Sequence, residues 1–122
     1  MAMAAKDELG RRGEQLAVEH LEQQGLVVLS RNWRCPEGEL DIVATDGLST
    51  VVFCEVKTRS GTGFGAPVEA VTRGKRRRIR RLANLWLIKA KPQSWTISRF
   101  DVIGILLQDG AKPQIQHIAE AF

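Results

Sequence analysis

The feature that most constrains this fold is the stretch Thr50–Arg59, which reads TVVFCEVKTR. Its run of β-branched and apolar residues predicts a central strand buried on both faces. The strand continues into Glu55-Val56-Lys57, and on a period of two Glu55 and Lys57 share a face. Removing a carboxylate and an ammonium from water is costly unless they are paired or bind a metal. These two side chains therefore either reach the open end of the sheet or serve a function.

A hairpin is predicted upstream of this strand. Leu40–Thr45 reads as a second strand, and Asp46-Gly47 is a strong signal for a tight turn into the central strand. Antiparallel pairing through that turn carries Asp41 to the far end of the hairpin, where Glu55 and Lys57 also lie. We therefore expect Asp41, Glu55 and Lys57 to converge within reach of a common metal.

Two alternatives stay open for this cluster. Simple alternation places the Asp41 side chain on the face of Glu39 and Val43, and a β-bulge would change that. The cluster is also compatible with a structural ion-pair network in which Lys57 neutralises Asp41 and Glu55.

Periodicity and turn residues predict the remaining elements of a single domain, residues 1–122. They are a helix over Lys6–Gln24 ended by Gly25, a strand over Leu26–Trp33, a turn at Cys35–Gly38, a helix capped by Thr72 that runs to about Lys89, one strand over Ser94–Leu107 or two broken near Gly104, and a hairpin through Asp109-Gly110 to Gln114–Ala119. In Ser94–Leu107, Asp101 interrupts an apolar run, and we interpret it as structural, paired with Arg99 or a basic group across the sheet. This order predicts an α/β fold with a central mixed sheet flanked by helices.

The positive charge of the chain is concentrated in one segment. Residues 73–81 (RGKRRRIRR) contain seven of the 18 basic residues and no acid, which leaves 11 basic against 14 acidic residues elsewhere. Like charges at i, i+4 on a helix repel one another, so this segment gains from an anion, although a solvated helix face is the alternative. A polyanionic partner is indicated. The side chains expected to contact nucleic-acid phosphates are Arg31, Arg34, Arg59, Lys75, Arg76, Arg77 and Arg80.

Several functional classes find no support in the sequence. No apolar run approaches the roughly 20 residues of a membrane-spanning helix, and the start of the chain lacks the apolar segment of a secretory signal. Cys35 and Cys54 have no zinc-site spacing, which favours reduced thiols and a cytoplasmic location. His20 and His117 have no triad partners, so nucleophilic catalysis is not indicated. The glycine-rich segment 60–67 fits G-x-G-x-x-A, but without an acidic residue about 20 positions on we interpret it as a mobile loop.

The pattern Asp41…Glu55-Val56-Lys57, with Glu39 where many members have proline, resembles the PD-(D/E)XK nuclease superfamily. The wider sequence pattern is similar to that of the YraN family, whose bacterial members are predicted to be endonucleases. This family is related to archaeal Holliday-junction resolvases. The residues that carry this resemblance are Gly13-Glu14 with Ala17, Arg31-Asn32-Trp33-Arg34, Gly38-Glu39-Leu40-Asp41, Phe53–Arg59, Ala70-Val71 with Lys75, and Arg99-Phe100-Asp101-Val102.

This resemblance implies a restriction-endonuclease-like three-layer fold and a metal-dependent site. It implies that Asp41, Glu55 and the backbone carbonyl of Val56 bind Mg²⁺ or Mn²⁺, and that Lys57 acts on the attacking water. It also places Glu14 beside the metal, whereas the helix pattern alone favours a solvent-facing glutamate. Hard oxygen ligands of this kind suit Mg²⁺, which keeps its remaining positions for water and phosphate.

The predicted function is therefore a metal-dependent endonuclease that hydrolyses phosphodiester bonds in structured DNA. Branched or nicked DNA is the expected partner, RNA is not excluded, and the kinship with resolvases implies a homodimer, although no stretch reads as a dimer interface. No membrane partner is expected. Two alternatives remain: a nucleic-acid-binding or assembly protein that retains the nuclease fold without cleavage, and a structural α/β domain whose basic helix binds RNA or protein.

Overall fold

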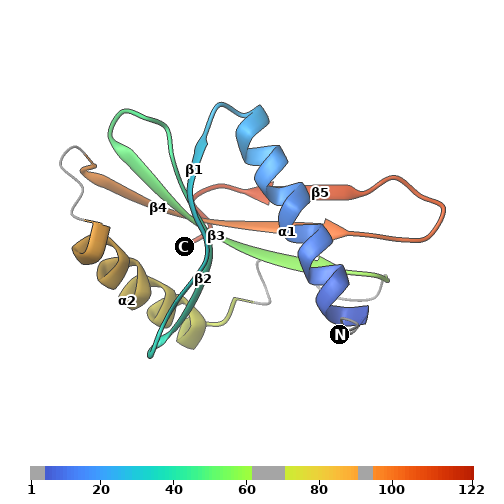
Figure 1. Ribbon diagram of the computed structural model, residues 1–122, viewed down its shortest axis with the longest axis horizontal. Coiled ribbons are helices and arrows are strands. Elements are labelled where there is room, and N and C mark those ends of the chain that lie inside the picture. The colour runs from blue at the N-terminus through green and yellow to red at the C-terminus, as the bar shows by residue number, and fades with distance from the viewer. Residues whose placement is uncertain (1–4, 62–70, 91–94) are drawn as a thin grey trace.

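The computed structural model describes residues 5–61, 71–90 and 95–122. Within these ranges the elements are α1 (Ala5–Gln23), β1 (Val27–Cys35), β2 (Gly38–Thr45), β3 (Thr50–Arg59), α2 (Arg73–Ala90), β4 (Ile97–Leu106) and β5 (Gln114–Ile118). The strands form one mixed sheet in the order β1-β2-β3-β4-β5, in which only the β3–β4 pair is parallel among these described strands. Figure 1 shows α1 and α2 lying across this sheet.

The boundaries follow from local chemistry that the sequence already indicated. Gly25 ends α1 with φ of 86°, and the amide of Leu26 donates to the carbonyl of Leu21 in the pattern of a Schellman cap. Thr72 caps α2, because its hydroxyl accepts a hydrogen bond from the Lys75 amide. In the β2–β3 turn, Asp46 Oδ1 accepts three backbone amide bonds while Gly47 adopts a positive φ.

The helices cover opposite faces of the sheet, which gives the predicted three layers. On one face, Leu40, Val43, Phe53 and Val102 pack with Ile79, Leu82 and Trp86 of α2. On the other face, Ile42, Cys54, Ile103 and Ile105 pack with Ala17, Val18 and Leu21 of α1. Phe53 is buried between the rings of Trp86 and Phe100, which ties β3 to α2 and β4. The position of β3 at the centre of both cores is thus confirmed.

The structure corrects one sequence expectation, on the strand β4, and leaves others outside the described residues. β4 runs without interruption through Gly104, so the alternative of two separate strands is wrong. The strand was expected to begin at Ser94, which lies outside the described residues, as does most of the glycine-rich segment 60–67. In the described part of the chain, neither helix is long and apolar enough to cross a membrane.

Candidate functional site

The candidate site lies where β2 and β3 separate. The two strands pair from Thr45↔Val51 to Ile42↔Cys54, and Asp41 is the next residue beyond the last pair. There the carboxylate of Asp41, and not its backbone, meets β3: Asp41 Oδ2 accepts a hydrogen bond of 2.9 Å from the amide of Val56. At this fork a hydrogen bond from the Val56 amide to the Asp41 side chain therefore takes the place of the backbone hydrogen bonds that join β2 to β3. It holds Asp41 beside the Glu55-Val56-Lys57 segment.

The strand β2 does not alternate regularly at this point. Leu40 and Val43 both belong to the core cluster on the α2 face, whereas Ile42 faces α1, so the expectation from simple alternation is wrong. The irregularity coincides with Asn32 of β1, whose φ of 51° interrupts the neighbouring strand between its pairs with Ile42 and Leu40. Asp41 belongs to neither core cluster, and its side chain points into the fork toward the Val56 amide.

Glu55 and Lys57 approach the fork from the α2 face. Glu55 lies opposite Val102 of β4, which belongs to the core cluster on that face. Burial, with the neighbouring Asp41 carboxylate as the second cause, raises the pKa of Glu55 to about 7, and the ammonium groups of Lys57 and Lys75 offset part of that rise. Burial also raises the pKa of Asp41, while the Val56 amide opposes the shift. The protein thus holds two desolvated carboxylates side by side, with lysines as counter-charges.

Glu14 approaches from the α1 face. Gly13 lets the helix come this close, because a Cβ at that position would overlap the Thr58 side chain of β3. Glu14 Oε1 accepts a hydrogen bond of 2.7 Å from Asn32 and lies 3.6 Å from Arg31 Nε. Burial raises the pKa of Glu14, and the Asp41 carboxylate adds to this rise. A solvent-facing role for Glu14 is therefore wrong, because the fold places it in the electrostatic field of the site.

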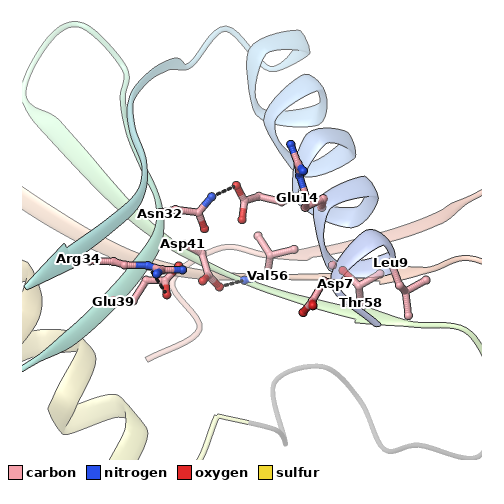
Figure 2. A pocket seen from close by; sticks show the side chains of 11 residues that line it. Asp7, Leu9, Glu14, Asn32, Arg34, Glu39, Asp41, Val56 and Thr58 are labelled. Atoms are coloured by element: carbon pink, nitrogen blue, oxygen red, sulfur yellow. Dashed lines mark hydrogen bonds and ion pairs between the residues drawn. The ribbon is translucent and has the colours of Figure 1, made fainter. Parts of the chain in front are cut away.

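Figure 2 shows a pocket of about 880 Å³ that Glu14 and Asp41 line, whereas Glu55 and Lys57 are not part of its lining. Its polar lining gathers Glu14 from α1, Asn32 and Arg34 from β1, and Glu39 and Asp41 from β2, above Val56 and Thr58 of β3. Asp7, Leu9, Gly10 and Arg11 of the first turns of α1 complete the lining. Arg34 pairs with Glu39 at 3.3 Å, so one predicted phosphate contact stands at the pocket rim.

The donor set fits a hard divalent cation. Within the described ranges, no three His, Cys, Asp or Glu side chains form a ready-made metal site. The paired carboxylates of Asp41 and Glu55 are nevertheless desolvated and mutually repulsive, which a cation would relieve. Mg²⁺ is commonly held by one or two carboxylates, with water and substrate phosphate completing its shell. The pair could hold such an ion, with Val56 and Glu14 adjacent.

The expected phosphate contacts fall into two groups. Lys75 lies beside Lys57, which lowers the pKa of the Lys75 amine, so this side chain belongs to the site. Arg76 donates to the Val71 carbonyl, and the Arg80 guanidinium lies 4.9 Å from the Phe100 ring centroid. These two arginines contribute to packing as well as to charge. The exposed cations in the first turns of α2 are Arg73, Arg77, Arg78, Arg80 and Arg81, and Lys89 is exposed in its last turn. Arg31 also donates to Gln15, and Arg59 lies at the end of β3.

The structure also brings together residues that sequence reasoning did not single out as part of the site. Asn32 lines the pocket and positions Glu14, although the sequence marked it only as part of a motif. Glu39, which the sequence reasoning allowed as a further contact to the metal or its ligands, also lines the pocket. The available signal was weak: asparagine tolerates a positive φ better than most residues, but nothing in the sequence marks where that φ is needed. His20, His117 and Asp101, interpreted separately, form one hydrogen-bonded cluster on the α1 face.

Comparison with known proteins places the chain in a family. Residues 13–105 match the Uncharacterised protein family UPF0102. The chain belongs to this family. The match spans Glu14, the Asp41 fork, the Glu55-Val56-Lys57 segment and the basic helix. The family is the YraN family that the sequence resemblance indicated.

Relatives in actinobacteria are similar over nearly their full lengths. A UPF0102 protein of Mycolicibacterium smegmatis is 54% identical over 120 residues, covering 98% of this chain and 96% of its own length. A UPF0102 protein of Frankia alni is 51% identical over 122 residues, covering 100% of both. Among solved structures, Archaeoglobus fulgidus Hjc, a Holliday junction resolvase, aligns with 85% of this chain and 72% of its own, at 17% identity and a TM-score of 0.48.

Proposed function

We propose that this protein is a divalent-metal-dependent endonuclease that hydrolyses phosphodiester bonds in structured DNA. The observation that carries the proposal is the β2–β3 fork, where Asp41 and Glu55 stand as adjacent desolvated carboxylates beside Lys57. The resemblance of Asp41…Glu55-Val56-Lys57 to the PD-(D/E)XK nucleases supports the same chemistry. Bound Mg²⁺ or Mn²⁺ would supply a Lewis acid for the scissile phosphate and a water of lowered pKa.

The roles of the protein groups follow from their positions. Asp41 and Glu55 would hold the cation, and the hydrogen bond from the Val56 amide keeps Asp41 aimed into the fork. Lys57 would orient the attacking water and offset the charge that develops on the phosphate. Lys75, at the start of α2, stands beside Lys57 and would contact the same phosphate group or its neighbour. Glu14 would act on a metal-bound water from the α1 side.

The basic helix supports a preference for DNA structure over base sequence. Its exposed cations gather on the first turns of α2, whose other face is core. Base readout needs a side chain presented rigidly to a groove edge, whereas long basic side chains on a packed helix suit backbone phosphates. The kinship of the sequence with resolvases makes branched or nicked DNA the first substrate to test.

The test is cleavage of labelled branched, nicked, linear and single-stranded substrates by purified protein in Mg²⁺ and in Mn²⁺. We expect Glu55→Gln to abolish cleavage while binding stays equal or becomes tighter, because the change removes negative charge near phosphate. Glu19→Gln, an exposed glutamate of α1, is the matched control and should cut at the wild-type rate. Wild-type protein that binds these substrates but cuts none would favour the non-catalytic binding role.

A further inference from the structure

Three polar side chains converge between the C-terminal end of α1 and β5, the strand at the edge of the sheet. Figure 1 shows these two elements. His20 Nε2 of α1 lies 3.1 Å from His117 Nδ1 of β5, and the rings meet edge to face at 74°. The side-chain amide of Gln24 lies 3.0 Å from the same Nε2 atom. His20 Nε2 therefore has two polar neighbours, His117 Nδ1 of β5 and the Gln24 amide at the end of α1.

A buried carboxylate fixes the tautomer of the neutral His117 ring. Asp101 is fully buried, and its oxygens accept hydrogen bonds from Arg99 and from the Glu120 amide. Asp101 Oδ2 also lies 2.7 Å from His117 Nε2. An ionised carboxylate only accepts hydrogen bonds, so His117 Nε2 carries the hydrogen. In the neutral ring Nδ1 is then a bare lone pair, and it points at His20.

With both imidazole rings neutral, one hydrogen cannot satisfy all three groups. If His20 Nε2 donates to His117 Nδ1, it has no lone pair for the Gln24 amide nitrogen and no second hydrogen for the amide oxygen. A cation between the three groups would instead accept one lone pair from each of them. Two imidazole nitrogens at about 2.0–2.1 Å from a tetrahedral zinc are about 3.3 Å apart, close to the observed 3.1 Å.

We propose that His117 Nδ1 and His20 Nε2 form a binding site for Zn²⁺ or a similar transition-metal ion, with water completing its shell. The Gln24 side chain becomes a third ligand when its amide turns so that the oxygen faces the ion in place of the nitrogen, which lies 3.0 Å from His20 Nε2. Asp101 serves as the positioning residue, because a carboxylate that accepts the second N–H of a ligating histidine orients the ring and raises its basicity. Imidazole ligands favour zinc over magnesium, so this site differs in kind from the carboxylate pair at the fork. A bound ion would tie α1 to the edge strand β5.

The test is a Zn²⁺ titration of the full-length, untagged chain in excess Mg²⁺, followed by long-range ¹H–¹⁵N spectra of the imidazoles. Because the chain has two histidines, every ring nitrogen can be assigned. We expect one equivalent of Zn²⁺ to shift His117 Nδ1 and His20 Nε2 while His117 Nε2 keeps its proton. Zinc that leaves these two nitrogens unmoved would overturn the proposal and leave the pair as a hydrogen bond only.

Variants separate coordination from a merely structural role. His20→Gln keeps a polar group at a half-buried position and should weaken Zn²⁺ binding at least tenfold. Gln24→His adds a third imidazole one helical turn after His20 and should tighten binding at least tenfold. Gln23→His, at the neighbouring exposed position, is the control and should leave the affinity unchanged. Equal affinities in wild type, His20→Gln and Gln24→His would refute the site.

Discussion

Replacing Glu55 by glutamine should stabilise the metal-free protein at high pH and have little effect at low pH. Burial raises the pKa of Glu55 from 4.5 to about 7, so the folded state binds a proton that the unfolded state releases across this window. The free energy of unfolding therefore falls as pH rises from about 4.5 to about 7 and levels off above it. At 1.36 kcal/mol per pKa unit, the ionised carboxylate costs about 3 kcal/mol at pH 8.

Glutamine keeps the neutral form at every pH and so avoids this cost. Urea unfolding in EDTA should show Glu55→Gln more stable than wild type by up to about 3 kcal/mol at pH 8, with the difference vanishing below about pH 4.5. Adding Mn²⁺ should stabilise the wild type and reverse the order, because the cation favours the ionised pair. Glu19→Gln is the control, since that side chain is exposed. A Glu55→Gln variant destabilised equally at both pH values would refute the reasoning.

Two further predictions concern the helices. Gly13→Ala should lower cleavage and lower the melting temperature, since the added Cβ overlaps Thr58 and pushes Glu14 away from the fork. The exposed Gly10→Ala, whose Cβ meets open space, is the stability control and should not lower the melting temperature. Replacing three exposed arginines of α2 by glutamine should flatten the slope of log K against log salt for duplex DNA by about two to three units, because each lost phosphate contact removes about 0.9. The three arginines are Arg73, Arg77 and Arg78. Lys112→Gln is the control and should leave that slope unchanged. An unchanged slope in the triple variant would mean that these arginines form only a solvated helix face.

Local chemistry explains why most elements could be predicted. Gly25 and Thr72 delimit their helices through backbone conformation and a capping hydroxyl, both of which act within a few residues. The Asp46-Gly47 turn fixes the register of the β2–β3 hairpin in the same way. The approach of Asp41 to Glu55 follows from that register, so a site built from one hairpin can be predicted from the sequence.

The interior of β2 could not be predicted by the same means. Alternation assumes a uniform strand, and β2 departs from it opposite Asn32 of the neighbouring strand, which adopts a positive φ. Asn32 also contacts Glu14 of α1, a partner 18 residues away in sequence. A strand pattern carries no information about such a contact.

The sequence by itself determined the order of elements, the central strand, the carboxylate–lysine segment and the basic helix, because each rests on periodicity, capping or turn chemistry between near neighbours. The helix pattern left Glu14 facing solvent, and the family resemblance placed it beside the site. Tertiary structure brings Glu14 close to Asp41, since Gly13 lets α1 meet Thr58 of β3. It alone decided that His20, His117 and Asp101 form one cluster, since α1, β5 and β4 meet only after the sheet has assembled. Contacts between distant segments depend on packing, and packing is a property of the whole chain.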